Sequence, residues 1–489
     1  MSNSQLQNLR GHDHGAPRAA AAWFAHESSA TLNLLGAWMA AGALTFAAAA
    51  CAADLPVLTS GHTDVGVNYE DGAWDLHVHH HHHGEFEPDA VWLQVGSGAL
   101  IRVPSHAAFS FLGEAGDPVW LLPAVENHDL LFLGLGTEEL ASGIFVDDSV
   151  TLTLKSVTGP GHFALYRVDP LGNPVVSMNS RDGIDASDTC VLTAGGHVHV
   201  NWAFSAPGRY RIGLQAAGVL AATGETATSD VAEYLFEVLP LNVDAGHVGV
   251  RVAYNPNTGA WTLAAGHAAL GIKFAPGQVR WIAQPAALRQ IPSDARFAFL
   301  GAAGDPIWIL PEVQDPHLLW PGFGLQAVPS GVFAGDEVGI RMVGLEGPGH
   351  FFLYQSDMLG NPIVSLNTRD GLDTNDVVRL KAGSHVHVSL GFTKPGDYRV
   401  SLQAVAELAG GGETSSAVYD YLFEVQYAPI LAVRRKDSGT LTLQWFSREH
   451  HEYHLHSVTD LAGSAGGVHP GGGSVEGTGG LLTLDVPAE

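Results

Sequence analysis

The residues best suited to chemistry in this chain are histidines placed two positions apart. His197 and His199 flank a valine in the segment HVHV, and the same segment returns at His385 and His387. On an extended strand, residues two apart project from the same face, so the two imidazoles of each pair can converge on one ion. Imidazole binds zinc, copper, nickel and iron, and such a site takes its remaining ligands from other segments.

Upstream segments offer those remaining ligands. His62 and Asp64, in GHTDV, would share one face of a strand, and His77 and His79 form a further alternating pair. We therefore predict a transition-metal site, with zinc as the favoured ion, rich in histidine and free of cysteine. The candidate ligands are His62, Asp64, His77, His197, His199, His247, His385 and His387.

Five consecutive histidines form a separate feature. They are His79, His80, His81, His82 and His83. Neighbouring residues on a strand alternate between its faces, so these five rings cannot share one face, and the Gly84 and Glu85 that follow predict a solvated loop. Such a loop either collects zinc, nickel or copper weakly above the main site or is a low-complexity insertion without a role of its own.

Carboxylates recur after an Asp-Gly pair. Asp182, Asp185 and Asp188 have a spacing that offers several oxygens in one short loop, as calcium requires, and are therefore candidate calcium ligands. Asp-Gly is first of all a turn signal, however, and we favour the turn over calcium.

Long segments of the chain occur twice. GHFALYRVDPLGNPVVSMNSRDGID, from Gly161, returns as GHFFLYQSDMLGNPIVSLNTRDGLD, from Gly349, and FLGEAGDPVWLLP, from Phe111, returns as FLGAAGDPIWILP, from Phe299. The HVHV segments lie at the same spacing of 188 residues. The duplication predicts two copies of one domain.

The domain boundaries follow from this duplication. We place repeat 1 at residues 55–240 and repeat 2 at residues 241–427, after an export segment at residues 1–54 and before a small β-module at residues 428–489. Each repeat is expected to be an all-β sandwich of the immunoglobulin or jelly-roll type, because segments such as VTLTLKSV and AEYLFEV alternate in polarity between Gly- and Pro-rich turns. The less regular stretch 124–140 is expected to hold a loop or a helical turn.

Comparison of the two copies sorts the histidines. Repeat 2 keeps His247 and its HVHV pair, whereas Gly249 and Ala264 stand in the places of Asp64 and His77. Either a core of three histidines is shared by both copies, or the site is complete in repeat 1 alone. Two readings without a metal stay open: histidines that only pin strands, and a polar ligand pocket.

Composition excludes some partners. The formal charge of −27 argues against nucleic acid, because phosphate recognition needs clustered Lys and Arg. Cys51 and Cys190 are the two cysteines, and Cys190 is expected to be a buried hydrophobe. The Ala-rich apolar run 32–53 predicts a signal peptide or a retained membrane anchor, and hence an exported protein at the cell surface, in the periplasm or outside the cell.

Several motifs together are similar to a known family. GHTDVGVNYEDGAWDLHV, FSFLGEAGDPVWLLP, GPGHFALY and GGHVHVNWAFSAPGRYRI resemble, in this order, the bacterial surface-anchored repeat known as the choice-of-anchor M domain. The resemblance covers both repeats. It implies an exported cell-envelope protein, often encoded beside ABC import systems of the metal type, and it implies no particular activity.

The sequence thus predicts an exported metal-binding protein that could support metal uptake. The alternative is a structural or adhesive surface protein whose repeats act as spacers without a metal. We predict that the protein is not an enzyme, because the sequence shows no identifiable general base, nucleophile elbow, P-loop or dinucleotide fingerprint.

Overall fold

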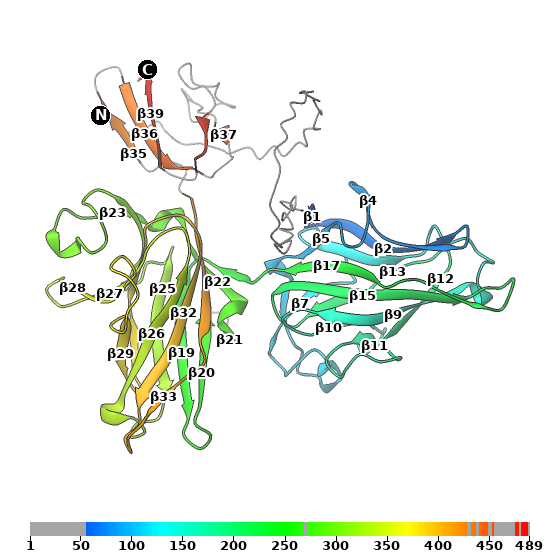
Figure 1. Cartoon of the computed structure of the whole chain (residues 1–489), viewed down its shortest axis with the longest axis horizontal. Coiled ribbons are helices and arrows are strands. Elements are labelled where there is room, and N and C mark those ends of the chain that lie inside the picture. Colours follow the sequence, from blue (N-terminus) through cyan, green and yellow to red (C-terminus); the bar gives the residue numbers. More distant parts are fainter. Residues whose placement is uncertain are drawn as a thin grey trace, which may run out of the picture.

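The predicted all-β fold is confirmed. The computed structural model describes residues 55–267, 271–427, 432–436, 440–447, 452–453, 475–478 and 481–487. Within these residues every regular element is a β-strand or a single 3-10 turn. The strands gather into two large lobes and a small C-terminal group (Figure 1). The expected export segment lies outside the described residues, as does much of the C-terminal segment.

Repeat 1 contains three sheets. The largest runs β1-β5-β17-β15-β9-β12, with β16 paired to β15. Its strands are β1 (Val57–Leu58), β5 (Trp92–Val95), β9 (Ser149–Thr158), β12 (Thr189–Thr193), β15 (Gly208–Val219), β16 (Thr226–Thr228) and β17 (Ala232–Val238). A second sheet consists of β11 (Pro174–Asn179), β10 (Phe163–Val168), β14 (Asn201–Phe204), β7 (Pro118–Leu122) and β6 (Leu100–Arg102).

The third sheet of repeat 1 carries the histidines and is called the histidine sheet below. Its order is β13 (His197–His199), β8 (Leu131–Gly136), β2 (Gly61–Glu70), β3 (Ala73–His80) and β4 (Gly84–Phe86). Strand β2 is central: it pairs in parallel with β8 and antiparallel with β3. Residues far apart in sequence therefore meet on one sheet.

Repeat 2 has the same sheets in the same order. Its large sheet consists of β18 (Leu241–Val243), β22 (Val279–Ala283), β34 (Tyr419–Val425), β32 (Gly396–Glu407), β26 (Glu337–Glu346) and β29 (Val377–Lys381), with β33 (Glu413–Ser415) beside β32. The second consists of β23 (Leu288–Gln290), β24 (Pro306–Leu310), β31 (Ser389–Phe392), β27 (Phe351–Ser356) and β28 (Pro362–Asn367). Its histidine sheet consists of β21 (Ile272–Phe274), β20 (Ala260–His267), β19 (Gly246–Asn255), β25 (Leu319–Ala327) and β30 (His385–His387).

The remaining elements are short. The 3-10 turns are η1 (Ser97–Ala99), η2 (Ala107–Phe109), η3 (Val146–Asp148), η4 (Pro276–Gln278), η5 (Pro285–Ala287), η6 (Ala295–Phe297) and η7 (Ala334–Asp336). The C-terminal strands are β35 (Ala432–Arg435), β36 (Thr440–Phe446), β37 (Glu452–Tyr453), β38 (Val475–Glu476) and β39 (Leu481–Pro487). Phe446 packs 5.4 Å from Trp308, which attaches β36 to the core of repeat 2.

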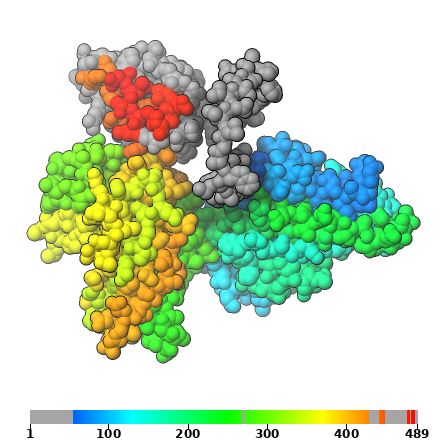
Figure 2. Space-filling model, viewed as in Figure 1, coloured from blue at the N-terminus to red at the C-terminus, as the bar shows by residue number. Residues whose placement is uncertain are grey.

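Each repeat has its own apolar core. Trp120, Trp202 and Phe236 are fully buried in repeat 1, and Trp308 and Phe351 are buried in repeat 2. The colours of Figure 2 separate accordingly, with blue, cyan and green atoms in one lobe and green, yellow and orange atoms in the other. Two buried cores allow each repeat to hold its own histidine sheet rigidly. Among the described residues no helix has the length and apolar character needed to cross a membrane.

Two local expectations are only partly right. The stretch 124–140 holds the expected loop at 124–130 and a turn at 137–140, but between them lies strand β8, whose LFLGLG sequence alternates leucine with glycine. The histidine run is not wholly a solvated loop, because β3 continues to His80, which is only 3% exposed. The ring Nε2 of His80 lies 3.1 Å from the carbonyl of Ser60, and His267 makes the equivalent contact with Ala245 at 3.2 Å. Each of these two histidines therefore ties the end of its strand to the residue just before the neighbouring strand, β2 or β19. Of the histidine run, only His81–His83 form an exposed turn.

Candidate metal centre

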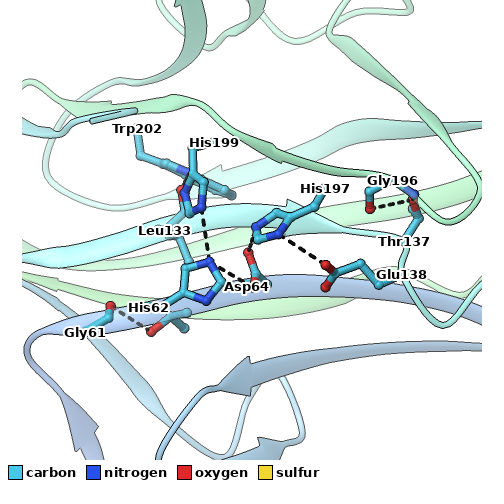
Figure 3. A network of polar contacts seen from close by, with 11 residues as sticks. Gly61, His62, Asp64, Leu133, Thr137, Glu138, Gly196, His197, His199 and Trp202 are labelled. Atoms are coloured by element: carbon cyan, nitrogen blue, oxygen red, sulfur yellow. Dashed lines mark hydrogen bonds and ion pairs between the residues drawn. The ribbon is translucent and has the colours of Figure 1, made fainter. Parts of the chain in front are cut away.

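One face of the histidine sheet gathers the candidate ligands of repeat 1. Along β2, Val65 and Val67 are buried in the core, so the alternating His62 and Asp64 project from the opposite face. His199 lies across β8 from Asp64, because Gly134 pairs with both residues. Three strands thus bring His62, Asp64, His197 and His199 together (Figure 3).

The three imidazoles form a nearly equilateral triangle. Ring centroids are 4.9 Å apart for His62 and His197, 5.0 Å for His62 and His199, and 4.8 Å for His197 and His199. The Nε2 atoms of His62 and His199 are 3.1 Å apart. Two nitrogens bound to one tetrahedral ion at about 2.0–2.1 Å would lie about 3.4 Å apart, so little movement is needed to bind one.

Asp64 supplies a carboxylate to the same point. It is 7% exposed, with Oδ1 2.9 Å from Nε2 of His197 and Oδ2 3.6 Å from Nε2 of His62. Apart from this close approach by His197, the buried Oδ1 has no hydrogen-bond donor. Burial raises the pKa of Asp64, while the two neighbouring histidines oppose that rise. A bound cation would compensate the buried charge.

Residues around the triangle hold its rings in place. His199 stacks on Phe132, with ring centroids 3.4 Å apart and planes 5° apart. Nδ1 of His197 lies 3.3 Å from Oε1 of Glu138. Burial, followed by the neighbouring His197 and His62, lowers the pKa of His199 to about 4. The sequence-based prediction missed Phe132 and Glu138, because both depend on the unrecognised strand β8 and the turn after it.

The glycines of β8 make room for these side chains. A Cβ at Gly134 would lie 2.2 Å from Oδ1 of Asp64 and 2.9 Å from Nε2 of His197. At Gly136 the nearest atom would be the Cβ of Asp64, at an ordinary 3.5 Å. The glycine nearest the triangle is therefore the one that the site requires, and the LFLGLG pattern was its signal in the sequence.

Repeat 2 builds the same triangle. Ring centroids are 5.0 Å apart for His247 and His385, 4.9 Å for His247 and His387, and 5.0 Å for His385 and His387. The Nε2 atoms of His385 and His387 are 3.3 Å apart. His387 stacks on Trp320 at 3.5 Å and 5°, and its Nδ1 lies 3.1 Å from the carbonyl of Pro321. That carbonyl orients the ring so that Nε2 faces the triangle.

The second triangle lacks carboxylates. Gly249 occupies the place of Asp64, and Gln326 occupies that of Glu138, with its Nε2 2.9 Å from Nδ1 of His385. Nε2 of His247 is buried without a hydrogen-bond partner. Burial, and then the two other histidines of the triangle, lower its pKa to about 4. A shared core of three histidines is therefore present in both repeats, and only repeat 1 adds an anionic ligand.

His77 does not belong to the triangle. It lies in a different group with His79, Glu85 and Glu139, whose potential ligand atoms are all within 4.8 Å of one another. The alternation of His77 with His79 predicted that this pair adds ligands to the same site, but β8 and β2 separate β3 from β13 in the sheet. Of the histidine run, His79 belongs to this group, His80 pins the strand, and His81–His83 are exposed.

The candidate calcium ligands support a turn. Both carboxylate oxygens of the buried Asp188 accept backbone hydrogen bonds, from Asn179 and Asp185. The carboxylate of Asp185 accepts from the backbone and hydroxyl of Ser187, while Asp182 is exposed. The equivalent carboxylate of repeat 2, that of Asp376, makes the same two backbone contacts.

Comparison with known proteins identifies no family. No protein-family model matches the chain, and no curated protein matches it. Among solved structures, a multicopper oxidase from Campylobacter jejuni, described as a metallo-oxidase, is matched at 10% identity and a TM-score of 0.15 over 76% of this chain. The chain spans 61% of that oxidase. CfaE, the adhesive subunit of CFA/I fimbria of enterotoxigenic Escherichia coli, is matched at 8% identity and a TM-score of 0.14, over 58% of this chain and 79% of CfaE.

The prediction that the protein is not an enzyme is corrected by this comparison. The matched metallo-oxidase is a catalytic protein, so the exclusion of catalysis is withdrawn. A TM-score of 0.15 assigns no activity to this chain. The resemblance to surface-anchored repeats stays a prediction.

Proposed function

We propose that the protein binds a transition-metal ion at each histidine triangle. The observation that carries this proposal is the recurrence of the same triangle in two repeats whose surrounding residues differ. The first site consists of His62, Asp64, His197 and His199, and the second of His247, His385 and His387. These ligand sets suit zinc or copper, and we favour zinc.

The lone pairs at the triangles argue against a purely structural role. A histidine that only pins a strand directs its ring nitrogens to backbone groups, as His80 and His267 do. In the triangles the Nε2 atoms face one another, and the buried Nε2 of His247 has no partner. In repeat 2, two rings can share one N–H···N hydrogen bond, but the third ring, that of His247, is left unsatisfied. A metal ion would satisfy all three.

The proposed setting is the cell envelope. We propose, on the apolar run 32–53 and the resemblance to surface-anchored repeats, that the protein is exported and supplies or sequesters metal for an ABC import system. The rival proposal, a structural or adhesive surface protein with spacer repeats, requires no metal. Metal content separates the two.

The test is elemental analysis of the full chain after treatment with a chelator, reloading with Zn²⁺ and dialysis. The comparison is with the variant His197→Ala/His385→Ala, which breaks both triangles. We expect the variant to hold two equivalents fewer than the parent. A difference below half an equivalent would overturn the proposal and favour the spacer role. Competition between Zn²⁺ and Cu⁺ at the reloaded sites then identifies the preferred ion.

A further inference from the structure

The first repeat contains a second group of metal-ligating side chains outside the triangle. It consists of His77 and His79 on β3, Glu85 on β4, and Glu139 in the turn after β8. His77 and His79 share one face of β3, and Glu85 is the direct cross-strand partner of His79. Three chain segments therefore converge, with all four candidate ligand atoms within 4.8 Å of one another.

A glycine makes room for the imidazole ring of His77. Gly66 pairs with His77 across β2 and β3, and a Cβ at Gly66 would lie 2.2 Å from Nε2 of the imidazole. The ring therefore lies across β2 and is 7% exposed. Its buried Nδ1 makes no hydrogen bond, although Oδ2 of Asp75 lies 3.4 Å away. Burial of an imidazole nitrogen without a hydrogen bond is costly unless another partner binds there.

Repeat 2 lacks this second group of candidate ligands. The sheet registers make Ala264 the equivalent of His77, Gly266 that of His79, and Lys273 that of Glu85. Ala327 takes the place of Glu139, three residues after the glycine that pairs with the first histidine of HVHV. All four candidate ligands are thus absent together, while the three histidines of the triangle remain.

Positive side chains replace the ligands in repeat 2. Arg251 stands where repeat 1 has Gly66, and a Cβ at Gly266 would lie 2.2 Å from its Nε. The guanidinium stem therefore crosses the position that His79 occupies in repeat 1. Lys273 places a second positive charge one strand further on. Repeat 2 thus holds fixed positive charge where repeat 1 gathers two imidazoles and two carboxylates. Positive side chains can occupy this position only if no cation binds there.

We propose that His77, His79, Glu85 and Glu139 bind a second divalent transition-metal ion in repeat 1, and that Arg251 and Lys273 replace this ion in repeat 2. Two imidazoles and two carboxylates form a ligand set that suits zinc, manganese or iron and, with both carboxylates ionised, balances a charge of +2. This site is independent of the proposed function, because it shares no ligand with the triangle.

The test compares Zn²⁺ stoichiometry and affinity among full-length variants in which the exposed His81, His82 and His83 are changed to Asn. In this background, His79→Gly/Glu85→Lys introduces the residues of repeat 2. We expect it to bind one equivalent less than the background, with the triangles still loaded. Glu139→Ala, at an exposed position, should weaken one equivalent at least about tenfold without altering the fold.

The outcomes of this experiment test the second metal site separately from the triangles. An unchanged stoichiometry and affinity in both variants would overturn the second site, whatever the triangles bind. Loss of more than one equivalent would also overturn it as an independent site. If His197→Ala/His385→Ala leaves one equivalent that His79→Gly/Glu85→Lys then removes, the second site stands. If that triangle variant loses no metal, the triangle proposal fails by itself.

Discussion

A histidine can bind a metal only when a ring nitrogen keeps its lone pair. The triangles favour this state by burying imidazoles next to one another, which lowers the pKa of His199 and of His247 to about 4. Both rings are therefore neutral at pH 7 and accept a metal without first losing a proton. This arrangement has a cost in folding free energy when the pH is low enough to protonate the rings, and that cost should be measurable in the metal-free protein.

The first prediction concerns the pH dependence of that cost. The unfolded chain binds protons at these histidines near pH 6.5, whereas the folded chain resists protonation until about pH 4. The contribution of both rings to stability is therefore present above pH 6.5 and is lost as pH falls toward 4. Urea midpoints of the metal-free chain should fall over this window. The variant His199→Asn/His247→Asn should show a smaller fall, and equal slopes for both proteins would contradict the prediction.

The second prediction concerns Glu138, which holds the outer nitrogen of His197 at 3.3 Å. A carboxylate in this position orients the ring and makes its metal-binding nitrogen more basic. Glu138→Gln, which introduces the residue type of repeat 2, should weaken metal binding at the first triangle by about 10–100-fold. Titration calorimetry measures this change. Glu114→Gln, at an exposed position of the same repeat, is the control and should leave the affinity unchanged.

At the scale of elements, strand β8 decides how much of the site the sequence could predict. The alternation of VTLTLKSV and AEYLFEV was sufficient for the all-β fold, and the HVHV spacing was sufficient to place two rings on one face. The LFLGLG strand was missed because glycine has low strand propensity and breaks the polar alternation of a half-buried strand. Its parallel pairing with β2 joins segments about 70 residues apart, and no local pattern specifies such a pairing.

The same argument explains the position of His77. Sequence spacing places two histidines on one face of β3, but it does not say which strands lie beside β3. The observed order puts β2 between β3 and β8, so His77 and His79 face Glu85 and Glu139 instead of joining the triangle. Neighbour relations in a sheet are a property of the whole fold, which the spacing of residues on one strand cannot reveal.

The third prediction uses β8 itself. Gly134→Ala adds a Cβ that would lie 2.2 Å from Asp64 Oδ1, so the carboxylate and the ring of His197 must move apart. The variant should lose the metal of the first triangle and keep that of the second. Gly136→Ala is the matched control, because it lies two residues away on the same face and meets ordinary contacts. Equal metal content in the two variants would show that the close fit at Gly134 is unimportant.

At the scale of the molecule, duplication has left two sites with different charge. The first triangle has Asp64 within its ligand set and Glu138 beside it, whereas the second has no carboxylate, and the neighbouring Arg251 also contributes to lowering the pKa of His247. A cation is attracted to the first environment and repelled by the second. The first triangle should therefore hold a divalent ion more tightly, while three imidazoles without a carboxylate in the second tolerate an ion of lower charge.

The last prediction follows from the separate cores of the two repeats. Metal that binds only the folded state stabilises it by about 2.7 kcal/mol when its free concentration is 100 times Kd. Because each triangle joins strands of a single repeat, this stabilisation should be confined to that repeat. Zn²⁺ should therefore slow amide hydrogen exchange in β13 and in β30. His197→Ala should abolish the effect in β13 and leave β30 protected, whereas loss in both strands would mean that the repeats bind metal as one unit.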